Sequence, residues 1–262
     1  MKTITQNLQR TLACAAGALL FSPSVFAAGT WNLNACTQNG LNSGNYGNSY
    51  NCASSNVSDL GATATAWGAS GAGSTFAVAN LVDYSGGFGV RNQNEGLSIS
   101  SPNHAMDNKG TLETILLSFN SSVILSQMTI SWSQNDSDIS VLRYVPANGA
   151  PTVSGKTAGG GAGGLLGSGW ELVGHYGNNA TNVATSINSS NLSSSYWLIS
   201  AYSSSFGGTA LDGAADYVKL LSVYGTTPGG STPEPTSLAL VAVALAGTGV
   251  ARRRKSAGTS VE

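Results

Sequence analysis

The segment Val123-Ile-Leu-Ser-Gln-Met-Thr-Ile-Ser-Trp132 alternates apolar and polar residues along its second half. Successive side chains of an extended chain point to opposite faces, so three apolar side chains share one face and three polar ones share the other. These are Met128, Ile130 and Trp132 on the first face, and Gln127, Thr129 and Ser131 on the second. This period of two is typical of an antiparallel strand with one buried face. The segment therefore predicts a β-rich domain.

Blocks rich in Trp, Tyr, Ile, Leu and Val recur on both sides of this segment, and turn-forming residues separate them. They predict the following strands: 62–67, 75–84, 112–120, 123–133, 139–145, 170–176, 181–187, 196–202 and 217–224. Such compact apolar blocks argue against a disordered chain. We therefore expect an all-β fold, an antiparallel β-sandwich of two sheets. The high strand count and the lack of a Cys-Trp-Cys core spacing favour a jelly-roll-like arrangement over an immunoglobulin one.

The stretch 155–169 contains a Gly-Gly-Gly-Ala-Gly-Gly core. A composition of this kind is typical of a flexible connection. Too few residues lie on either side of it to build two separate cores. We therefore expect a mobile surface loop within one domain that spans 28–225.

Charge is sparse between residues 28 and 230. The acidic residues there are Asp59, Asp83, Glu95, Asp107, Glu113, Asp136, Asp138, Glu171, Asp212 and Asp216, and the basic ones are Arg91, Lys109, Arg143, Lys156 and Lys219. Ten acids against five bases give this part a net charge of −5, whereas the whole chain carries −1. The remaining cations lie near the two chain ends. No basic patch is present to hold phosphates, so we expect no nucleic-acid partner.

The N-terminal segment has the three parts of a secretory signal peptide. Lys2 and Arg10 supply positive charge, 11–21 form an apolar stretch, and Val25-Phe26-Ala27 ends in a small residue. We expect a signal peptide at 1–27, cleaved between Ala27 and Ala28. Cys14 lies within the apolar stretch and not directly after it, which argues against a lipoprotein.

The C-terminal segment also has three parts. A linker rich in Gly, Pro and Ser at 226–232 leads to Pro233-Glu234-Pro235, an uncharged apolar helix is expected at 237–251, and Arg252-Arg253-Arg254-Lys255 stops it. The helix would be about 22 Å long, which is short for a hydrocarbon core of about 30 Å. Basic clusters stay on the cytoplasmic side, so 256–262 would be a cytoplasmic tail and the domain would face outward. The basic cluster argues against the alternative, a buried helix of a soluble domain.

These residues resemble a known signal. Pro233, Glu234 and Pro235, followed by an apolar helix and the cluster Arg252, Arg253, Arg254 and Lys255, are similar to the PEP-CTERM sorting signal of Gram-negative bacteria, here at 233–255. The resemblance implies that an exosortase, a membrane protease, recognises and removes the tail. It further implies an inner-membrane intermediate held by the helix, and final delivery to the cell surface or extracellular matrix.

Four blocks of the domain add to this resemblance. They are 101–108, 135–142, 169–176 and 195–202. These blocks resemble a family of exosortase-dependent surface proteins, which is defined by its sequence and its sorting. The resemblance implies a place outside the cell, and it implies no activity.

Cys36 and Cys52 are the two cysteines of the mature domain. In an oxidising exterior we expect them to form one disulfide across a loop rich in Gly and Asn. Closing a loop of this size stabilises the folded state by about 3 kcal/mol in the chain-entropy model. A catalytic thiolate is not expected, because pairing removes it.

The run Asn135-Asp136-Ser137-Asp138 gathers hard oxygen ligands, and Asp107-Asn108 could join it in space. Calcium prefers such ligands, so Asp136 and Asp138 are candidate metal ligands. The alternative is a turn in which Asn and Asp bond their own backbone. We expect no other cofactor.

Catalytic sites are not expected. His104 or His175 could be combined with Asp107 or Asp138 and one of many serines, but this abundance makes the combination uninformative. The glutamates show no spacing that pairs them for glycoside hydrolysis. They are Glu95, Glu113 and Glu171. We therefore expect a protein that is not an enzyme.

Three functional classes follow, and the first is favoured: a structural or adhesive surface protein, for instance of a biofilm matrix. The second is a lectin-like module that contacts extracellular polysaccharide, which would require Trp31, Trp67 and Tyr84 to face solvent. The third is a hydrolase, which would require a cleft with two carboxylates.

Overall fold

The computed structural model describes residues 27–39, 46–57, 59–70, 73–96, 102, 104–145 and 149–228. These belong to one compact unit, Phe26–Pro228. The expected signal peptide, except Ala27, and the expected sorting signal at 233–255 lie outside the described residues. Within the described part of the chain, no helix is long and apolar enough to span a membrane.

The described chain is built from strands and three short 3₁₀ turns, which confirms the all-β prediction. The strands are β1 (Ala28–Asn32), β2 (Thr37–Asn39), β3 (Ser49–Ala53), β4 (Gly61–Ser70), β5 (Phe76–Tyr84), β6 (Gly87–Arg91), β7 (Met106–Asp107), β8 (Thr111–Asn135), β9 (Ile139–Tyr144), β10 (Trp170–Tyr176), β11 (Ala184–Ser186), β12 (Ser194–Ala201) and β13 (Asp216–Thr226). The 3₁₀ turns are η1 (Leu33–Ala35), η2 (Leu166–Ser168) and η3 (Ser204–Phe206).

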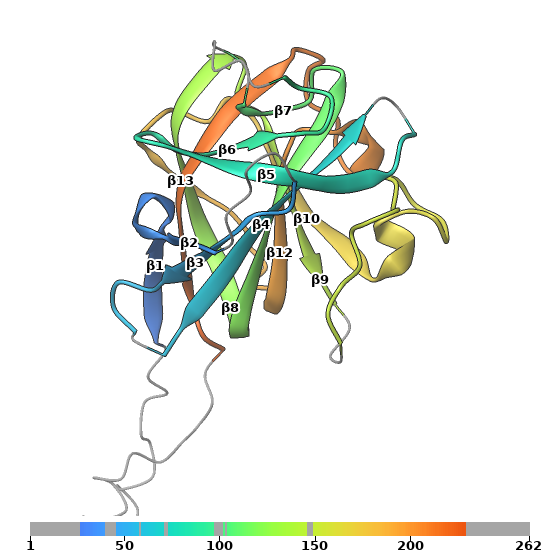
Figure 1. The fold of residues 1–262 in the computed structure, drawn as a ribbon. Helices are drawn as coiled ribbons and strands as arrows, with labels where there is room; N and C mark the ends of the chain where they lie inside the picture. The colour runs from blue at the N-terminus through green and yellow to red at the C-terminus, as the bar shows by residue number, and fades with distance from the viewer. Residues whose placement is uncertain are drawn as a thin grey trace, which may run out of the picture. The chain divides into compact units, whose positions relative to one another are not determined.

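Strand β8 belongs to both sheets of the domain (Figure 1). Its first half pairs with β4 and β12, and its second half pairs with β13 and β11. Strand β5 changes sheet in the same way, from β4 to β6. The strands β8, β13, β6, β5 and β4 therefore form a closed ring of hydrogen-bonded neighbours. The prediction of a jelly-roll with two separate sheets is corrected by this ring, since strands that switch sheets make its corners.

The segments 112–120 and 123–133, predicted as two strands, are one strand of 25 residues. Asn120-Ser121-Ser122 looked like a turn in the sequence, yet this stretch stays extended. It lies where β8 leaves β4 and begins to pair with β13, so it marks the passage between sheets and not a reversal of the chain.

The main core is built from side chains of the ring strands together with those of β1, β9 and β12. Trp31 of β1 is completely buried there, and its ring meets that of Phe119 edge-on with the centroids 4.7 Å apart. Its indole N–H donates to the Leu60 carbonyl at 3.0 Å. The Trp31 side chain thus both fills the core and satisfies its polar group, as buried tryptophans usually do.

A second apolar cluster covers the opposite face of the sheet that contains β9 and β12. Leu165, from the glycine-rich connection 155–169, and Val153, just before it, pack there with Leu116, Leu142 and Leu198. The backbone of this connection is also hydrogen-bonded to itself, for example from Leu165 N–H to the Thr157 carbonyl at 2.9 Å. The prediction of a mobile surface loop at 155–169 is therefore wrong in part: the loop is a packed cover of the sheet.

Cys36 and Cys52 form the predicted disulfide. It links the residue after η1 to β3. The cross-link joins two segments 16 residues apart and restricts the unfolded chain between them, which favours the folded state.

Both ends of the domain leave it on the same side. Strand β1 pairs antiparallel with β13, so that Ala28 lies opposite Thr226. Just beyond this pair, Thr227 N–H donates to the Ala27 carbonyl at 2.9 Å. The chain toward the expected signal peptide and the chain toward the expected sorting signal therefore start next to each other.

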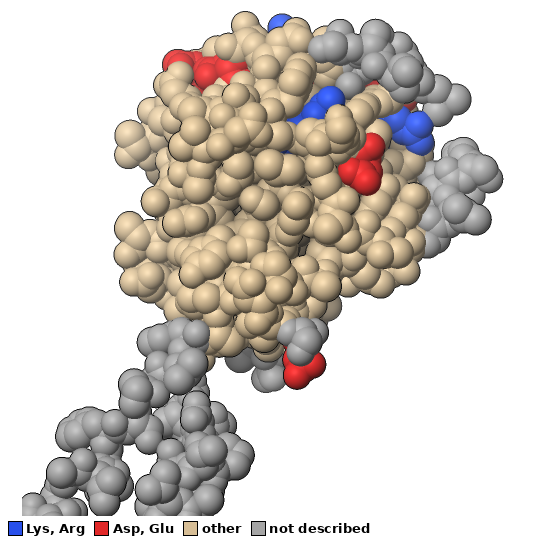
Figure 2. All heavy atoms as spheres, turned by 90° about the vertical axis from the view of Figure 1, so that its left-hand side faces the viewer, with Lys and Arg blue, Asp and Glu red and all other residues tan. Residues whose placement is uncertain are grey.

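The outer surface contains few charged side chains. On the face in Figure 2, Lys, Arg, Asp and Glu appear in small separate groups among uncharged residues. Asparagines contribute to the turns as well as to the polar surface, because several adopt the left-handed conformation that Asn tolerates better than most residues. These are Asn135, Asn178, Asn182, Asn188 and Asn191.

Candidate functional site

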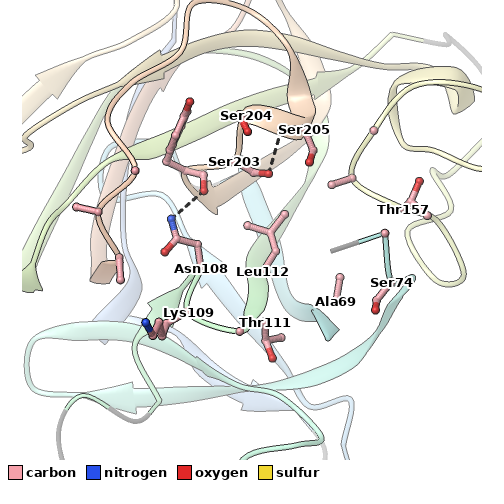
Figure 3. Close-up of a pocket in the computed structure, with 18 of the residues that line it drawn as sticks. Ala69, Ser74, Asn108, Lys109, Thr111, Leu112, Thr157, Ser203, Ser204 and Ser205 are labelled. Carbon is pink, nitrogen blue, oxygen red and sulfur yellow. Dashed lines mark hydrogen bonds between the residues drawn. The ribbon is translucent and has the colours of Figure 1, made fainter. Parts of the chain in front are cut away.

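A pocket of about 640 Å³ opens between segments that are far apart in the sequence. Its lining comes mainly from 108–112, 157–159, 202–205 and 212–215. Figure 3 shows hydroxyl and amide groups around an open space, with Asn108 and Lys109 across from Thr157. Two of the four blocks quoted from the sequence, 101–108 and 195–202, each contribute one residue to this lining, Asn108 and Tyr202.

Asn108 holds one wall of the pocket in place. Its side-chain amide donates to the Tyr202 carbonyl at 3.0 Å and to Asp216 Oδ2 at 2.5 Å. Its Oδ1 accepts from the Asp216 N–H at 2.9 Å. The asparagine thus ties together β12, β13 and the loop before β8, and it connects the pocket to three aspartates behind it.

These three aspartates, Asp136, Asp138 and Asp216, form what we call the aspartate site. Asp136 and Asp138 lie in the turn between β8 and β9, and Asp216 begins β13. One carboxylate oxygen from each lies within 4.8 Å of the other two. Asn135, with φ of 64°, ends β8 in the left-handed conformation and so turns the chain into the site.

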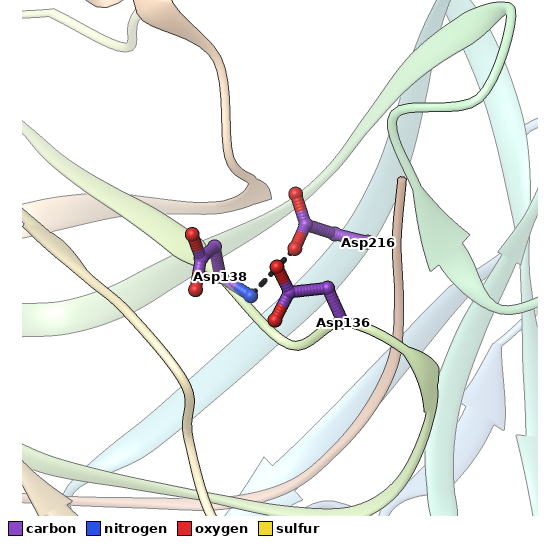
Figure 4. A group of neighbouring side chains, drawn as sticks. All are labelled: Asp136, Asp138 and Asp216. Atoms are coloured by element: carbon purple, nitrogen blue, oxygen red, sulfur yellow. Dashed lines mark hydrogen bonds between the residues drawn. The ribbon is translucent and has the colours of Figure 1, made fainter. Parts of the chain in front are cut away.

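Backbone N–H groups fix each carboxylate of the aspartate site. Asp216 Oδ1 accepts from Asp138 N–H at 2.7 Å, and Asp138 Oδ1 accepts from Asn178 N–H at 2.6 Å. Asp136 Oδ1 accepts from Ser137 N–H at 2.7 Å. Figure 4 shows the carboxylates of Asp136 and Asp216 close together, whereas that of Asp138 turns to the other side of its backbone.

Burial dominates the electrostatics of the site. It raises the pKa of Asp216 to about 7, against the lowering effect of the Asp138 N–H and with a further rise from the charges of Asp138 and Asp136. Burial also raises the pKa of Asp138. Carboxylates this close repel one another when ionised, so either a proton or a cation stabilises the group.

The calcium prediction stays a prediction, now with a third carboxylate. Asp216 was missed from the sequence because it lies 78 residues from Asp138, and only the β8–β13 pairing brings it near. Asn108 joins the site as expected, but through hydrogen bonds to Asp216. Asp107 does not join it, since its Oδ1 accepts from Lys109 N–H at 2.8 Å.

We expect calcium to raise the melting temperature of the protein, because an ion between Asp136 and Asp216 would neutralise their repulsion in the folded state only. Asp136→Asn should abolish this rise, while Asp59→Asn, outside the aspartate site, should preserve it. Thermal melts with calcium and with EDTA measure the difference. An identical melting temperature in both buffers would rule out calcium binding.

Asp107 belongs instead to a second pair of acids, with Glu113. Glu113 is completely buried in β8, and its two oxygens accept from Asn92 Nδ2 at 2.7 Å and from Asp107 N–H at 3.1 Å. Burial, and then the charges of Asp107 and Glu95, raise the pKa of Glu113 well above its usual range. Burial raises the pKa of Asp107 to about 7. We call these two residues the buried acid pair.

Neither histidine shows a hydrogen bond to these aspartates in the described part of the chain, although the charge of His175 acts on Asp138 and opposes the rise of its pKa. His104 is buried, with its ring nitrogens near the Tyr84 hydroxyl and the Gly96 carbonyl, each at 3.2 Å. His175 lies 2.6 Å from the Gly207 carbonyl through Nε2 and 2.9 Å from Ser140 Oγ through Nδ1. Because a carbonyl only accepts, the proton belongs on Nε2 and Ser140 donates to Nδ1.

Ser140 and His175 thus have the contact of a nucleophile and its base, but Ser140 has no exposed surface. A substrate cannot reach a buried hydroxyl, and this argues for a structural pair. Glu171 is engaged elsewhere, in an ion pair with Arg143 at 2.9 Å.

The aromatic residues named for a lectin-like surface do not form one. Trp31 is buried in the core, and Trp67 is half-buried against the second apolar cluster. The Tyr84 ring carries the Lys219 ammonium 3.6 Å from its centroid. A sugar ring therefore cannot stack on Trp31, and Lys219 already occupies Tyr84.

Comparison with known proteins identifies the C-terminal tail. Residues 231–255 match the PEP-CTERM protein-sorting motif, which confirms the prediction made from Pro233-Glu234-Pro235 and the basic cluster. A motif of this kind implies export and exosortase processing at a membrane. The match covers the tail alone, and the blocks of the domain lie outside it. No curated protein and no solved structure matches the chain.

Proposed function

We propose that the protein is a non-enzymatic structural or adhesive component of the bacterial cell surface or extracellular matrix, delivered there after an exosortase cleaves its tail. The sorting motif at 231–255 carries this proposal. Before cleavage, the apolar segment 237–251 would hold the protein in the inner membrane.

The short stretch of chain between the last strand and the sorting motif supports this order of events. Strand β13 ends at Thr226, and only 227–230 separate it from the matched motif. A membrane protease would therefore meet the end of the domain where β1 and β13 pair. Ten residues, 227–236, lie between β13 and the apolar segment 237–251, and a chain of this length reaches at most about 35 Å, so the domain would stay near the membrane until it is released.

The character of the domain supports a role without catalysis. His104 and Ser140 are buried and His175 is half-buried, and each is hydrogen-bonded within the domain. Within the pocket lining, Asp212 is the one carboxylate among the described residues. Glycoside hydrolysis usually needs two. A compact ring of paired strands, with a disulfide that tethers β3, suits a protein that works by presenting a surface.

Replacing Pro233, Glu234 and Pro235 together by alanine tests the sorting proposal. We expect the variant to keep its tail and to stay in the membrane fraction, whereas Pro228→Ala, just before the matched motif, should be processed like the unchanged protein. Membrane fractionation shows where each variant resides, and intact-mass measurement shows whether it keeps its tail. Equal processing of the two variants would contradict exosortase recognition of the motif.

A further inference from the structure

The pocket beside Asn108 has the size of a ligand site. Its volume of about 640 Å³ falls within the range of small-molecule pockets and would hold about twenty water molecules. No sequence motif marks this pocket, because its walls come from segments that only the fold brings together. We propose that this pocket binds an uncharged sugar unit of an extracellular polysaccharide.

Seven of the nineteen residues that line the pocket carry a side-chain hydroxyl. They are Ser74, Thr111, Thr157, Tyr202, Ser203, Ser204 and Ser205. Each aliphatic hydroxyl can donate one hydrogen bond and accept two, as sugar hydroxyls do. Ser204 and Ser205 are exposed and Thr157 is half-buried, so these hydroxyls are available to a ligand. The half-buried Ser74 hydroxyl already donates to the Ser70 carbonyl and is left to accept. A polyhydroxylated ligand matches this lining better than an apolar one.

The charges of the pocket favour an uncharged ligand. Lys109 and Asp212 are its charged lining residues, and both are exposed. Their charges are opposite, so the lining has no net charge to hold a phosphate or a cation. Each can still form a charge-assisted hydrogen bond to a hydroxyl group.

An apolar strip forms part of the lining. Ala69 of β4 and Leu112 of β8 lie directly opposite each other across the strand pair, and Ala158 lines the pocket from the glycine-rich connection. The faces of a sugar ring present C–H groups, which pack on such a strip while the ring hydroxyls bond to its border. The strip thus provides apolar contact in place of an exposed aromatic ring. Trp31 and Tyr84 do not offer such a ring, because Trp31 is buried and Lys219 lies over Tyr84.

The pocket walls are fixed before a ligand arrives. Asn108 is bonded to Tyr202 and Asp216, and Lys109 N–H to Asp107. Ser203 Oγ accepts from Ser205 N–H at 3.3 Å and so caps the turn η3. A rigid site loses less conformational entropy on binding, which matters for a ligand that forms a few hydrogen bonds only. The aspartate site and the buried acid pair thus act here as positioning groups for the pocket.

Sugar binding would give the surface role proposed above a specific ligand. It rests on that proposed function in one respect only: export places the protein where extracellular polysaccharide is found. Binding is tested on the purified full chain in a detergent without a sugar head group, by saturation-transfer difference NMR. The probes are the methyl glycosides of glucose, galactose, mannose and N-acetylglucosamine, with glucuronate and inorganic phosphate as charged competitors. We expect saturation transfer to at least one neutral glycoside, and no displacement by either anion.

Two pocket variants and one control locate the binding. Ser204→Trp should fill the pocket and abolish transfer, and Asp212→Ala should weaken binding about tenfold through loss of its hydrogen bonds. Thr181→Trp, exposed and outside the lining, should bind like the unchanged protein. Melting curves establish that each variant is folded. No transfer to any neutral glycoside, transfer unchanged in Ser204→Trp, or displacement by an anion would overturn the proposal. Tail processing is measured separately, by intact mass, so sugar binding and exosortase processing can each be contradicted without the other.

Discussion

The melting temperature of the protein is expected to fall as the pH rises from 5 to 8. Burial raises the pKa of Asp107 and of Asp216 to about 7, and that of Glu113 well above its usual range. In the unfolded chain these carboxyls titrate near 4. The folded protein therefore holds protons in this interval that the unfolded chain has already released.

The direction of this change in melting temperature follows from proton linkage. Where the folded state binds more protons than the unfolded state, the free energy of unfolding decreases as the pH increases. The stabilisation is complete below about pH 4, and the part due to Asp107 and Asp216 is lost as the pH passes through about 7. In a domain of this size each kcal/mol corresponds to about 2–4 °C of melting temperature. Melts are recorded in EDTA, so that no bound cation offsets the carboxylate charges.

Asp107→Asn is the matched variant for this prediction. The amide can keep an oxygen acceptor for the Lys109 N–H, and it removes both the ionisation of residue 107 and its charge next to Glu113. We expect a flatter decline of melting temperature with pH and little change at pH 5. A melting temperature that rises between pH 5 and 8 in the unchanged protein would contradict the assignment of protonated buried acids.

Gly89→Ala is expected to leave little folded protein. Gly89 lies in β6 between two completely buried residues, and a Cβ there would overlap the carbonyl oxygen of His104. His104 cannot easily retreat, because its backbone is already left-handed with φ of 62° and its ring is bonded to Tyr84 and Gly96. Overpacking by side chains costs about 1–3 kcal/mol, and an overlap with rigid backbone exceeds that.

Gly160→Ala is the control for this change. Gly160 lies in the glycine-rich connection, where a Cβ would meet open space and φ lies outside the left-handed region. Its effect should stay within about 0.5 kcal/mol. Circular dichroism and limited proteolysis compare the two variants. A Gly89→Ala protein that melts close to the Gly160→Ala protein would contradict the tight contact between β6 and His104.

The strands with long apolar blocks could be predicted from the sequence, and the short ones could not. Segments such as 139–145 and 170–176 contain enough β-branched and aromatic residues to stand out. Strands β2, β3 and β6 are short and rich in Asn, Ser or Gly. Pairing with neighbouring strands holds all three, and the Cys36–Cys52 bridge additionally ties β3 to the residue before β2. Local propensity is too weak to indicate such strands.

The candidate site could be predicted only where its residues are close in sequence. Asp136 and Asp138 share a turn and were found, whereas Asp216 needs the pairing of β13 with β8. Glu113 was considered only as a glutamate without a partner, although its position within the apolar run 112–120 was a signal of burial. The pocket gave no signal, since Ser, Gly and Ala are common throughout the chain and only their convergence in space is specific.

The intact mass of the protein extracted from the cell surface tests the central claim most directly. We predict a mass well below the 26.4 kDa of the full chain, with an N-terminus at Ala28 and a C-terminus near the Pro233-Glu234-Pro235 motif. A surface protein that retains 237–262 would contradict exosortase processing and would make this an ordinary membrane-anchored protein.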